Sequence, residues 1–588
     1  MKRMIALCLA LLLVFGMAAC GETTTTENDA STDAQQTETA APVDAEEMGF
    51  YLHPSDYQGE MPLVPEGEKK TITIGVRTSA KVLDYNDNEF TKWIEEQTGI
   101  DVEFMQFSGS ASDAATQISL MIASGERLPD ILLNIGGINK ATAKEYVRDG
   151  YFIDLREYMD SEAYYMHEAA QLYFPGEQYD DFADNLMFYI TDPATGDVFS
   201  TPYGYFCESD ELQGHIWING EWLDNLGLEQ PKTVEELYDV LVAFRDQDPN
   251  GNGLKDEIPM TGMALNARSN VLQYVINAFI YCFDKYKYIV DDGVVSAPYH
   301  TDEYREAMKY LRKLVDEGLL TPLTWTQSSS ELQALLNPIE GMPHTVGVVM
   351  APAEQRFLPD SDAMFVFEPL RLLEDATGRG GHGPISNAQI EYGVYITADC
   401  EEPLLAFRLI DFLASPEALL RMEHGVLGED WEYYDDPTGT SGSYGGPARI
   451  NLLNPTALDT AHRKSWNNVA AFSSDQYWQV LTDVNDGSYT GTMYKKLQEQ
   501  VKNYKDMGMN QEVMYMFERT EEEDERWNDV NSELNTFIGT ARSNFCNGIW
   551  DPNSDSDWND YVATLESLGY FDTWIDVAQS SYDRHHGK

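Results

Sequence analysis

The stretch that decides the fold runs from Thr71 to Phe107 and reads TITIGVRTSAKVLDYNDNEFTKWIEEQTGIDVEFMQF. Its first six residues alternate apolar and polar side chains, which is typical of a strand. Residues Glu89–Thr98 place apolar side chains at helical spacing and stop at Gly99, and Ile100–Phe107 is again strand-like. A strand, a helix and a strand of these lengths predict two parallel strands joined by a right-handed helical crossover.

The same alternation continues outward from this stretch. A second helix is expected over Asp113–Ser124 and a third strand over Leu128–Asn134. Further segments repeat the two periodicities: strands at His344–Pro352, Ala363–Leu370 and Glu391–Thr397, and helices at Tyr304–Glu317, Leu404–Leu413 and Pro416–His424. The part from Asp486 onward is mostly helical and aromatic. We therefore expect an α/β protein of two lobes with extra C-terminal helices.

The charge of the chain argues against nucleic acid and anionic membrane surfaces as partners. It has 588 residues, of which 99 are Asp or Glu and 39 are Lys or Arg, which gives a formal net charge of −60. Such an excess repels phosphate backbones and anionic membrane surfaces. Nucleic acid is therefore not expected as a partner, and the membrane is expected only through an anchor.

The N-terminus indicates export. Lys2 and Arg3 precede an apolar run that is too short for a membrane span, and Met-Ala-Ala-Cys ends at Cys20. This resembles the lipobox of bacterial lipoproteins, so residues 1–20 are expected to be a lipoprotein signal with Cys20 as the acylated residue. The alternative is a plain secretory signal cut near Ala19. Residues 21–68 hold twelve acids and no Lys or Arg, which predicts a disordered acidic tether.

The cysteines of the exported part give no metal-binding spacing. Cys207, Cys282, Cys400 and Cys546 lie far apart and form no CxxC motif. An exported protein could pair them, but spacing does not decide which, and buried free thiols are an equal alternative.

The segment DPNGNGLKDE, Asp248–Glu257, has the first half of an EF-hand loop. Oxygen ligands recur at positions 1, 3 and 5, glycine follows at position 6, and the carbonyl at position 7 would face inward. Pro259 stands at position 12, so two later acids must replace the usual glutamate. The candidate ligands are Asp248, Asn250, Asn252, Leu254 through its carbonyl, Asp256 and Glu257. The cation would be structural; the alternative is a Gly/Asn turn with solvated acids.

Together these motifs resemble a known family. SGERLPDILL, WINGEWLDNLGLEQPKTVEELYDVLVAFRDQDPNGNGLKDEIPMTG and RLIDFLASPEALLRMEHGVLGEDW are similar to the extracellular solute-binding lipoproteins of bacterial ABC importers, specifically the large carbohydrate-binding kind. The resemblance runs from about Lys70 to Arg584. It implies a type II periplasmic-binding-protein-like clamp, a carbohydrate ligand, a permease partner, a monomer and Ca²⁺ in the modified loop.

Mapping that fold onto the chain gives expected lobes. Lobe 1 would hold residues 70–208 plus about 352–392, and lobe 2 would hold residues 216–350 plus about 398–588 with the helical additions. The first crossing is expected near Tyr205–His215.

A sugar presents apolar faces to aromatic rings and hydroxyls to polar side chains, and its cleft lies at the carboxyl ends of strands. That rule selects candidates from loops after strands and from loop-like aromatic positions. The expected ligand-binding residues are Arg77, Asp84, Tyr85, Asp87, Asn134, Tyr203, Tyr205, Trp325, Arg379, His382, Trp431 and Trp466. We expect Trp93, Trp222, Trp527, Trp558 and Trp574 to be core residues, because they lie at helical spacing or in helix-rich segments.

Two motifs of enzyme active sites match this sequence only in part. GRGGHG at Gly378–Gly383 matches GxGxxG, but Pro384 follows where a helix should begin. His167-Glu168 begins an HExxH motif but lacks the second histidine. The resemblance implies a binding protein without catalysis. Two alternatives stay open: an extracellular glycan-degrading enzyme, or the same fold binding a peptide or another non-sugar solute.

Overall fold

The computed structural model describes residues 57–173, 187, 189–192, 194–206, 214–284, 287–374, 378, 381–382, 391–436, 438, 440–442, 447–448, 450–454, 457–458, 460–466, 472–474, 483–507, 513–514, 517 and 519–586. The expected signal, Cys20 and most of the expected tether lie outside them. Within these residues no helix is both long and apolar enough to cross a membrane.

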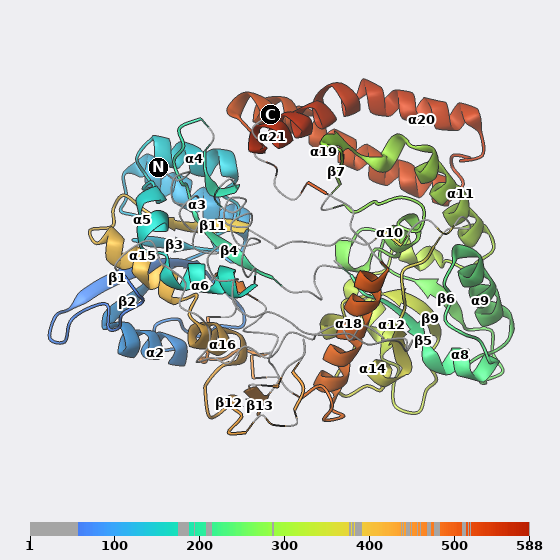
Figure 1. Cartoon of the computed structure of the whole chain (residues 1–588), viewed down its shortest axis with the longest axis horizontal. Helices are drawn as coiled ribbons and strands as arrows, with labels where there is room; N and C mark the ends of the chain where they lie inside the picture. The colour runs from blue at the N-terminus through green and yellow to red at the C-terminus, as the bar shows by residue number, and fades with distance from the viewer. Residues whose placement is uncertain are drawn as a thin grey trace, which may run out of the picture. The chain divides into compact units, whose positions relative to one another are not determined.

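Lobe 1 is built on a six-stranded sheet in the order β14-β4-β11-β3-β1-β2 (Figure 1). The strands are β1 (Lys70–Arg77), β2 (Ile100–Phe107), β3 (Ile131–Leu133), β4 (Thr201–Phe206), β11 (Glu391–Ile396) and β14 (Phe472–Ser474). The pairs β1–β2 and β1–β3 are parallel, as the sequence predicted, whereas β11 runs antiparallel to both of its neighbours. The sheet is therefore mixed.

Helices cover both faces of this sheet because its strands alternate. Ile131 and Leu133 pack on one face with helices α2, α5, α6, α15 and α16, while Leu132 packs on the other with α3 and α4. The bounds are α2 (Glu89–Thr98), α3 (Ala111–Ser124), α4 (Lys140–Arg148), α5 (Arg156–Ser161), α6 (Tyr164–Tyr173), α15 (Pro403–Phe412) and α16 (Pro416–His424). The predicted ends of α2, β2 and α16 are those observed. A hairpin follows α16, made of β12 (Trp431–Tyr433) and β13 (Ile450–Leu452).

Lobe 2 is built on a four-stranded sheet in the order β10-β5-β9-β6. Its strands are β5 (Ile216–Asn219), β6 (Ile258–Thr261), β9 (Val346–Met350) and β10 (Phe367–Pro369). The helices between them are α8 (Gly220–Leu226), α9 (Val234–Asp246), α10 (Val271–Ile276), α11 (Asp302–Asp316), α12 (Ser329–Leu336), α13 (Ala353–Arg356) and α14 (Ala363–Val366). A hairpin of β7 (Ile289–Asp291) and β8 (Val294–Ser296) leads into α11.

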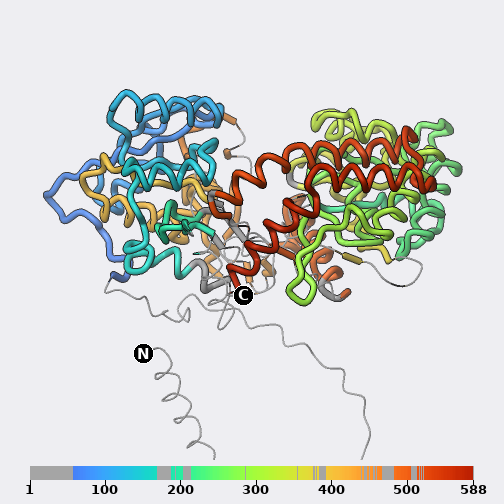
Figure 2. Tube along the Cα trace, turned by 90° about the horizontal axis from the view of Figure 1, so that it is seen from above, coloured from blue at the N-terminus to red at the C-terminus, as the bar shows by residue number. Residues whose placement is uncertain are grey.

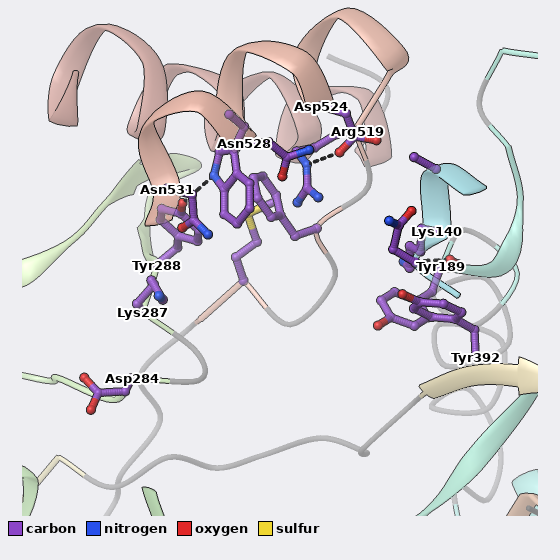
Figure 3. Close-up of a pocket in the computed structure, with 15 residues that line it drawn as sticks. Lys140, Tyr189, Asp284, Lys287, Tyr288, Tyr392, Arg519, Asp524, Asn528 and Asn531 are labelled. Carbon is purple, nitrogen blue, oxygen red and sulfur yellow. Dashed lines mark hydrogen bonds and ion pairs between the residues drawn. The ribbon is translucent and has the colours of Figure 1, made fainter. Parts of the chain in front are cut away.

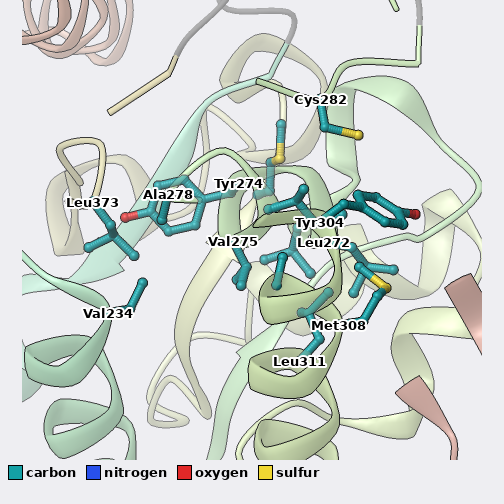
Figure 4. Close-up of a cluster of buried hydrophobic side chains, with 14 of the residues drawn as sticks. Val234, Leu272, Tyr274, Val275, Ala278, Cys282, Tyr304, Met308, Leu311 and Leu373 are labelled. Atoms are coloured by element: carbon teal, nitrogen blue, oxygen red, sulfur yellow. The ribbon is translucent and has the colours of Figure 1, made fainter. Parts of the chain in front are cut away.

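The C-terminal helices complete the core of lobe 2. They are α18 (Tyr489–Asp506), α19 (Glu521–Cys546), α20 (Asp555–Ser567), the π-helix η5 (Tyr570–Ile575) and α21 (Asp576–His585). Leu534, Ile538 and Phe545 of α19 pack in the same cluster as Leu311 and Leu314 of α11. Figure 2 shows these helices in red beside the yellow-green segments of lobe 2, and Figure 4 shows part of their shared apolar cluster around Tyr274 and Tyr304.

Two expected lobe assignments are wrong. Residues 363–370 were expected to be a lobe 1 strand, but they form α14 and β10, and β10 pairs antiparallel with β5 in lobe 2. The helices from residue 403 to 424 were expected in lobe 2, but Phe407, Leu409 and Leu419 are buried in the lobe 1 core. The apolar pattern of a strand does not indicate which of two sheets the strand joins. The chain thus crosses between sheets after β4, after β10 and after β14.

Three cysteines are free thiols in the described part of the chain. Cys282 and Cys546 are buried and Cys400 is half-buried, while Cys207 lies outside the described residues. Burial raises the pKa of the Cys282 and Cys546 thiols to about 12, so both stay protonated and act as apolar packing groups.

Candidate functional site

A cavity of about 510 Å³ is lined by residues of both lobes, and we call it the cleft cavity (Figure 3). Its volume lies within the range of small-ligand sites. The lining residues are Asn139, Lys140, Ala141, Tyr189, Asp284, Lys287, Tyr288, Tyr392, Met514, Phe517, Arg519, Asp524, Trp527, Asn528 and Asn531. Five of these side chains are aromatic rings, so the cavity combines flat apolar surface with polar groups.

The lobe 2 wall of the cavity is one face of the start of α19. Thr520 caps this helix: its hydroxyl accepts the N–H of Glu523, and the Glu523 carboxylate accepts the N–H of Thr520. With the first turn fixed in this way, positions 524, 527, 528 and 531 recur every three or four residues and face the same side. Asp524, Trp527, Asn528 and Asn531 therefore line the cavity together.

Trp527 is held in place by neighbouring rings and a cation. Its Nε1 donates to the Tyr288 hydroxyl at 3.2 Å, and its ring lies edge-on to Phe517 with centroids 5.3 Å apart. The Arg519 guanidinium lies 4.2 Å from the Trp527 ring centroid and donates to Asp524 at 2.6 Å. The side chain is only half-buried, so part of the indole remains available to a ligand.

The lobe 1 wall is formed by Lys140 with two tyrosines. Lys140 opens α4, and its Nζ lies 3.1 Å from the Tyr189 ring centroid and 5.4 Å from that of Tyr392. The same ammonium donates to the Tyr189 carbonyl at 3.0 Å. The two tyrosine rings are 6.2 Å apart and tilted by 54°. In Figure 3 this group lies across the cavity from Arg519 and Asn528.

The charges of the cavity differ from those of the whole chain. Its lining has three cations, Lys140, Lys287 and Arg519, and two carboxylates, in a protein with a net charge of −60. Burial lowers the pKa of Lys287, whose ammonium donates to Asn535 Oδ1 at 2.7 Å. Burial would raise the pKa of Asp284, but the Arg542 guanidinium 3.1 Å away holds it below its usual value. The cavity thus offers both charged donors and charged acceptors.

The predicted residues whose side chains the structure describes do not line the cleft cavity. Tyr85 is buried and its hydroxyl donates to the Arg77 carbonyl, while Arg77 itself donates to the Gly109 carbonyl. Asp84 and Asp87 lie beside the Arg463 guanidinium.

Trp431 and Trp466 have no exposed surface, and their Nε1 groups donate to the Gly425 carbonyl and the Thr91 hydroxyl. These two indoles are packing residues in this structure, and we do not retain them as candidates.

The remaining predicted positions lie in different parts of the structure or outside its described residues. Asn134 ends β3 with φ 46°, and its N–H donates to the Gly393 carbonyl. Tyr203 and Tyr205 lie on β4, although their side chains are not described, and Arg379 lies outside the described residues. The N–H of His382 donates to the Asn277 carbonyl. Trp325 lines a second cavity, and none of the twelve is among the described residues of the cleft cavity.

The loop Asp248–Glu257, predicted as an oxygen-ligand loop, is tightly wound around the Asp248 carboxylate. Asp248 has φ 49°, and its two carboxylate oxygens accept the N–H groups of Asn252 and Gly253 at 3.1 and 3.0 Å. The side-chain amide nitrogen of Asn252 lies 3.0 and 3.1 Å from the two Asp256 oxygens. Leu254 is 61% exposed, so its side chain points away from the loop.

These residues fit a hard cation. Glu257 Oε1 is buried without a hydrogen-bond partner, and burial raises the Glu257 pKa with help from Asp256 and Asp248. Rotating the Asn250 and Asn252 amides would exchange their nitrogens for oxygens at the same positions. No group of three His, Cys, Asp or Glu side chains forms a metal cluster in the described residues, so amide and carbonyl oxygens would have to supply the remaining ligands.

The fold and the cavity define a two-lobed solute-binding protein. The family model "Bacterial extracellular solute-binding protein" matches residues 84–419, and the chain belongs to this family. Its predicted fold class, a type II periplasmic-binding-protein-like clamp, is confirmed by its structural neighbours.

Among curated relatives is FusA of Streptococcus pneumoniae, a fructooligosaccharide ABC transporter substrate-binding protein, 25% identical over 90% of this chain and 93% of FusA. YtcQ of Bacillus subtilis, a polygalacturonan/rhamnogalacturonan-binding protein, is 28% identical over 40% of this chain and 47% of its own length.

Solved structures share the fold. FusA in complex with kestose has a TM-score of 0.65 at 22% identity and covers 88% of this chain and 100% of that structure. An HMO-binding solute-binding protein from Bifidobacterium longum infantis has a TM-score of 0.67 at 19% identity, over 88% of this chain and 99% of the other.

Proposed function

We propose that this protein captures an oligosaccharide outside the cell, in the cleft cavity, and delivers it to the permease of an ABC importer. The observation that supports this most is the composition of the cavity: aromatic rings on both walls, with amides, carboxylates and cations between them. Rings pack against the apolar faces of sugars, while the polar groups reach their hydroxyls. Membership of the solute-binding family and the FusA match along 90% of the chain support the same role.

Binding between two walls gives a delivery mechanism. A ligand that touches both Lys140 of lobe 1 and Trp527 of lobe 2 favours the arrangement in which these walls lie close together. A permease that recognises that arrangement then selects the loaded protein. We do not assign catalysis: the relatives are binding proteins, and the carboxylates Asp524 and Asp284 are each engaged by an arginine.

The solute class is tested by thermal shift. We expect fructo-oligosaccharides or oligogalacturonides to raise the melting temperature, because a ligand at a hundred times its Kd stabilises the folded state by about 2.7 kcal/mol. A peptide mixture is the control. If peptides alone raised the melting temperature, the ligand would be a peptide and not a sugar. If new reducing ends appeared during incubation with oligosaccharides, the protein would be an enzyme.

We propose further that the protein is a monomer held at the outer face of the cell membrane by a lipid on Cys20, since the Met-Ala-Ala-Cys motif places a small-residue cleavage site directly before the cysteine. Mass spectrometry of the membrane-extracted protein is expected to find an N-terminal acylated Cys20. An unmodified peptide that begins at or near Cys20 would contradict the anchor.

We also propose that the loop Asp248–Glu257 binds a structural Ca²⁺. The buried, partnerless Glu257 Oε1 and the convergence of Asp248 and Asp256 support this. One solved structure of FusA is described as an EF-hand mutant, so an EF-hand is described in a protein of similar fold.

A further inference from the structure

A second cavity, of about 750 Å³, adjoins the cleft cavity, and we call it the α19 cavity. Asp284 and Lys287 line both, so the two cavities share these side chains as part of their walls. Its other walls come from lobe 2: the segment 264–272, Trp325 at the end of η4 (Pro322–Trp325), and the second half of α19. An occupant of the cleft cavity that extended past Asp284 and Lys287 would reach this space.

The α19 side of this cavity, its floor, is mostly polar. Asn535, Thr536, Gly539, Thr540 and Ser543 follow one another on successive turns of the helix and line the cavity. These residues offer hydroxyl and amide groups, or no side chain at all. Trp325, half-buried against the lobe 2 core, supplies a ring at the cavity wall. Rings combined with hydroxyls and amides are the surface that suits a sugar.

Gly539 is the unusual residue of this floor. It lies in the interior of a 26-residue helix, where glycine is less favourable than alanine. Its φ is not in the left-handed region, and among the described residues no heavy atom lies within 4 Å of the position a Cβ would take. By contrast, a Cβ at Gly347 would meet the Phe244 ring at 2.4 Å. Neither backbone conformation nor packing within the chain therefore requires glycine at 539, and its effect is to leave room above the helix.

We propose that the α19 cavity is a second saccharide subsite, in which further units of the oligosaccharide lie over Gly539 and against Trp325 while one end occupies the cleft cavity. This inference rests on the proposed function and adds to it a preference for longer chains. Lys287 and Asp284 line both cavities. Lys287 can donate hydrogen bonds to sugar units on either side, and Asp284 can accept hydrogen bonds from them.

The test measures the binding affinity of oligosaccharides of increasing length, which we call the size ladder. Fructo-oligosaccharides and oligogalacturonides, from the disaccharide to the longest soluble member, are titrated calorimetrically into the wild-type protein, Gly539→Leu, Trp325→Ala and Ser532→Leu. Leucine favours a helix, so Gly539→Leu is expected to melt no lower than the wild type while its side chain fills the α19 cavity. Ser532 lies on the same helix and lines neither cavity, which makes Ser532→Leu the matched control.

We expect affinity in the wild type to rise with chain length, and Gly539→Leu to weaken the long members about tenfold or more while leaving the shortest binder unchanged. Trp325→Ala should act in the same direction and Ser532→Leu should not. Long chains bound equally by the wild type and Gly539→Leu would overturn the second subsite and leave the proposed function standing. A wild-type protein that binds no member of either ladder, although other sugars or peptides stabilise it, would overturn both the ladder preference and the sugar class tested.

Discussion

Removal of calcium is expected to lower the melting temperature of the protein by about 8–16 °C. A cation present at a thousand times its Kd stabilises the folded state by about 4 kcal/mol, and each kcal/mol shifts the melting temperature of a domain of this kind by about 2–4 °C. The loop closes between α9 and β6, directly beside the lobe 2 sheet, so its disorder would release the edge of that sheet.

The residues of the loop explain why the effect should be large. Without a cation, the carboxylates of Asp248, Asp256 and Glu257 repel one another within one short turn, and Glu257 Oε1 is buried with no donor. A divalent ion removes both penalties at once. The measurement is a melting curve with and without EDTA, in the presence and absence of added CaCl₂.

Two variants distinguish the effect of cation binding in the loop from the effect of removing any surface carboxylate. Asp248→Ala should melt at the temperature of the chelated wild type and should no longer respond to EDTA. Asp239→Ala removes an exposed carboxylate of α9 that lies outside the loop, and it should respond to EDTA like the wild type. Superimposable wild-type curves with and without EDTA would show that the loop is only a turn.

Local periodicity was enough to predict most of lobe 1. The stretch from Thr71 to Phe107 carries its own stop signal, Gly99, which is the C-cap of α2 in the structure, while the Asn88 side chain caps the start of the helix. The parallel pairing of β1 with β2 and β3 follows from the helical connections between them. The sequence did not predict which sheet β10 and β11 join. The two strands have similar apolar patterns, yet they pair in different lobes.

The cleft cavity was harder to predict because helices supply much of it. The ligand residues predicted after the third strand end at Asn134, although Asn139 and Lys140 follow a few residues later and do line the cavity. Trp527 was expected to be core because it lies in a helical pattern. A single turn of α19 points it at the cavity, and only the packing of this helix on lobe 2 decides that orientation. Tryptophans in loops, by contrast, proved to be buried at 431 and 466.

Replacing Trp527 with alanine is expected to weaken oligosaccharide binding by about thirtyfold or more, which corresponds to about 2 kcal/mol. The substitution removes the largest ring of the lobe 2 wall and the partner of the Tyr288 hydroxyl and the Arg519 guanidinium. Part of the loss would come from these neighbours, which would no longer be held against the ligand.

Trp93 provides a matched control. It is also a half-buried indole under an arginine, with the Arg421 guanidinium 4.8 Å from its ring, but it lies on α2 of lobe 1 and lines neither cavity. Trp93→Ala should cost comparable stability, about 1–3 kcal/mol, and leave binding unchanged. Lys140→Met keeps the length of the side chain on the opposite wall and removes its charge, so it reports whether the lobe 1 wall also binds the ligand.

The most direct test of the account is a calorimetric titration of one stabilising oligosaccharide into the wild type, Trp527→Ala, Lys140→Met and Trp93→Ala. A site shared between the lobes predicts weaker binding for both Trp527→Ala and Lys140→Met, with wild-type affinity for Trp93→Ala. Wild-type affinity in both cavity variants would contradict the claim that this protein captures its solute in the cleft cavity.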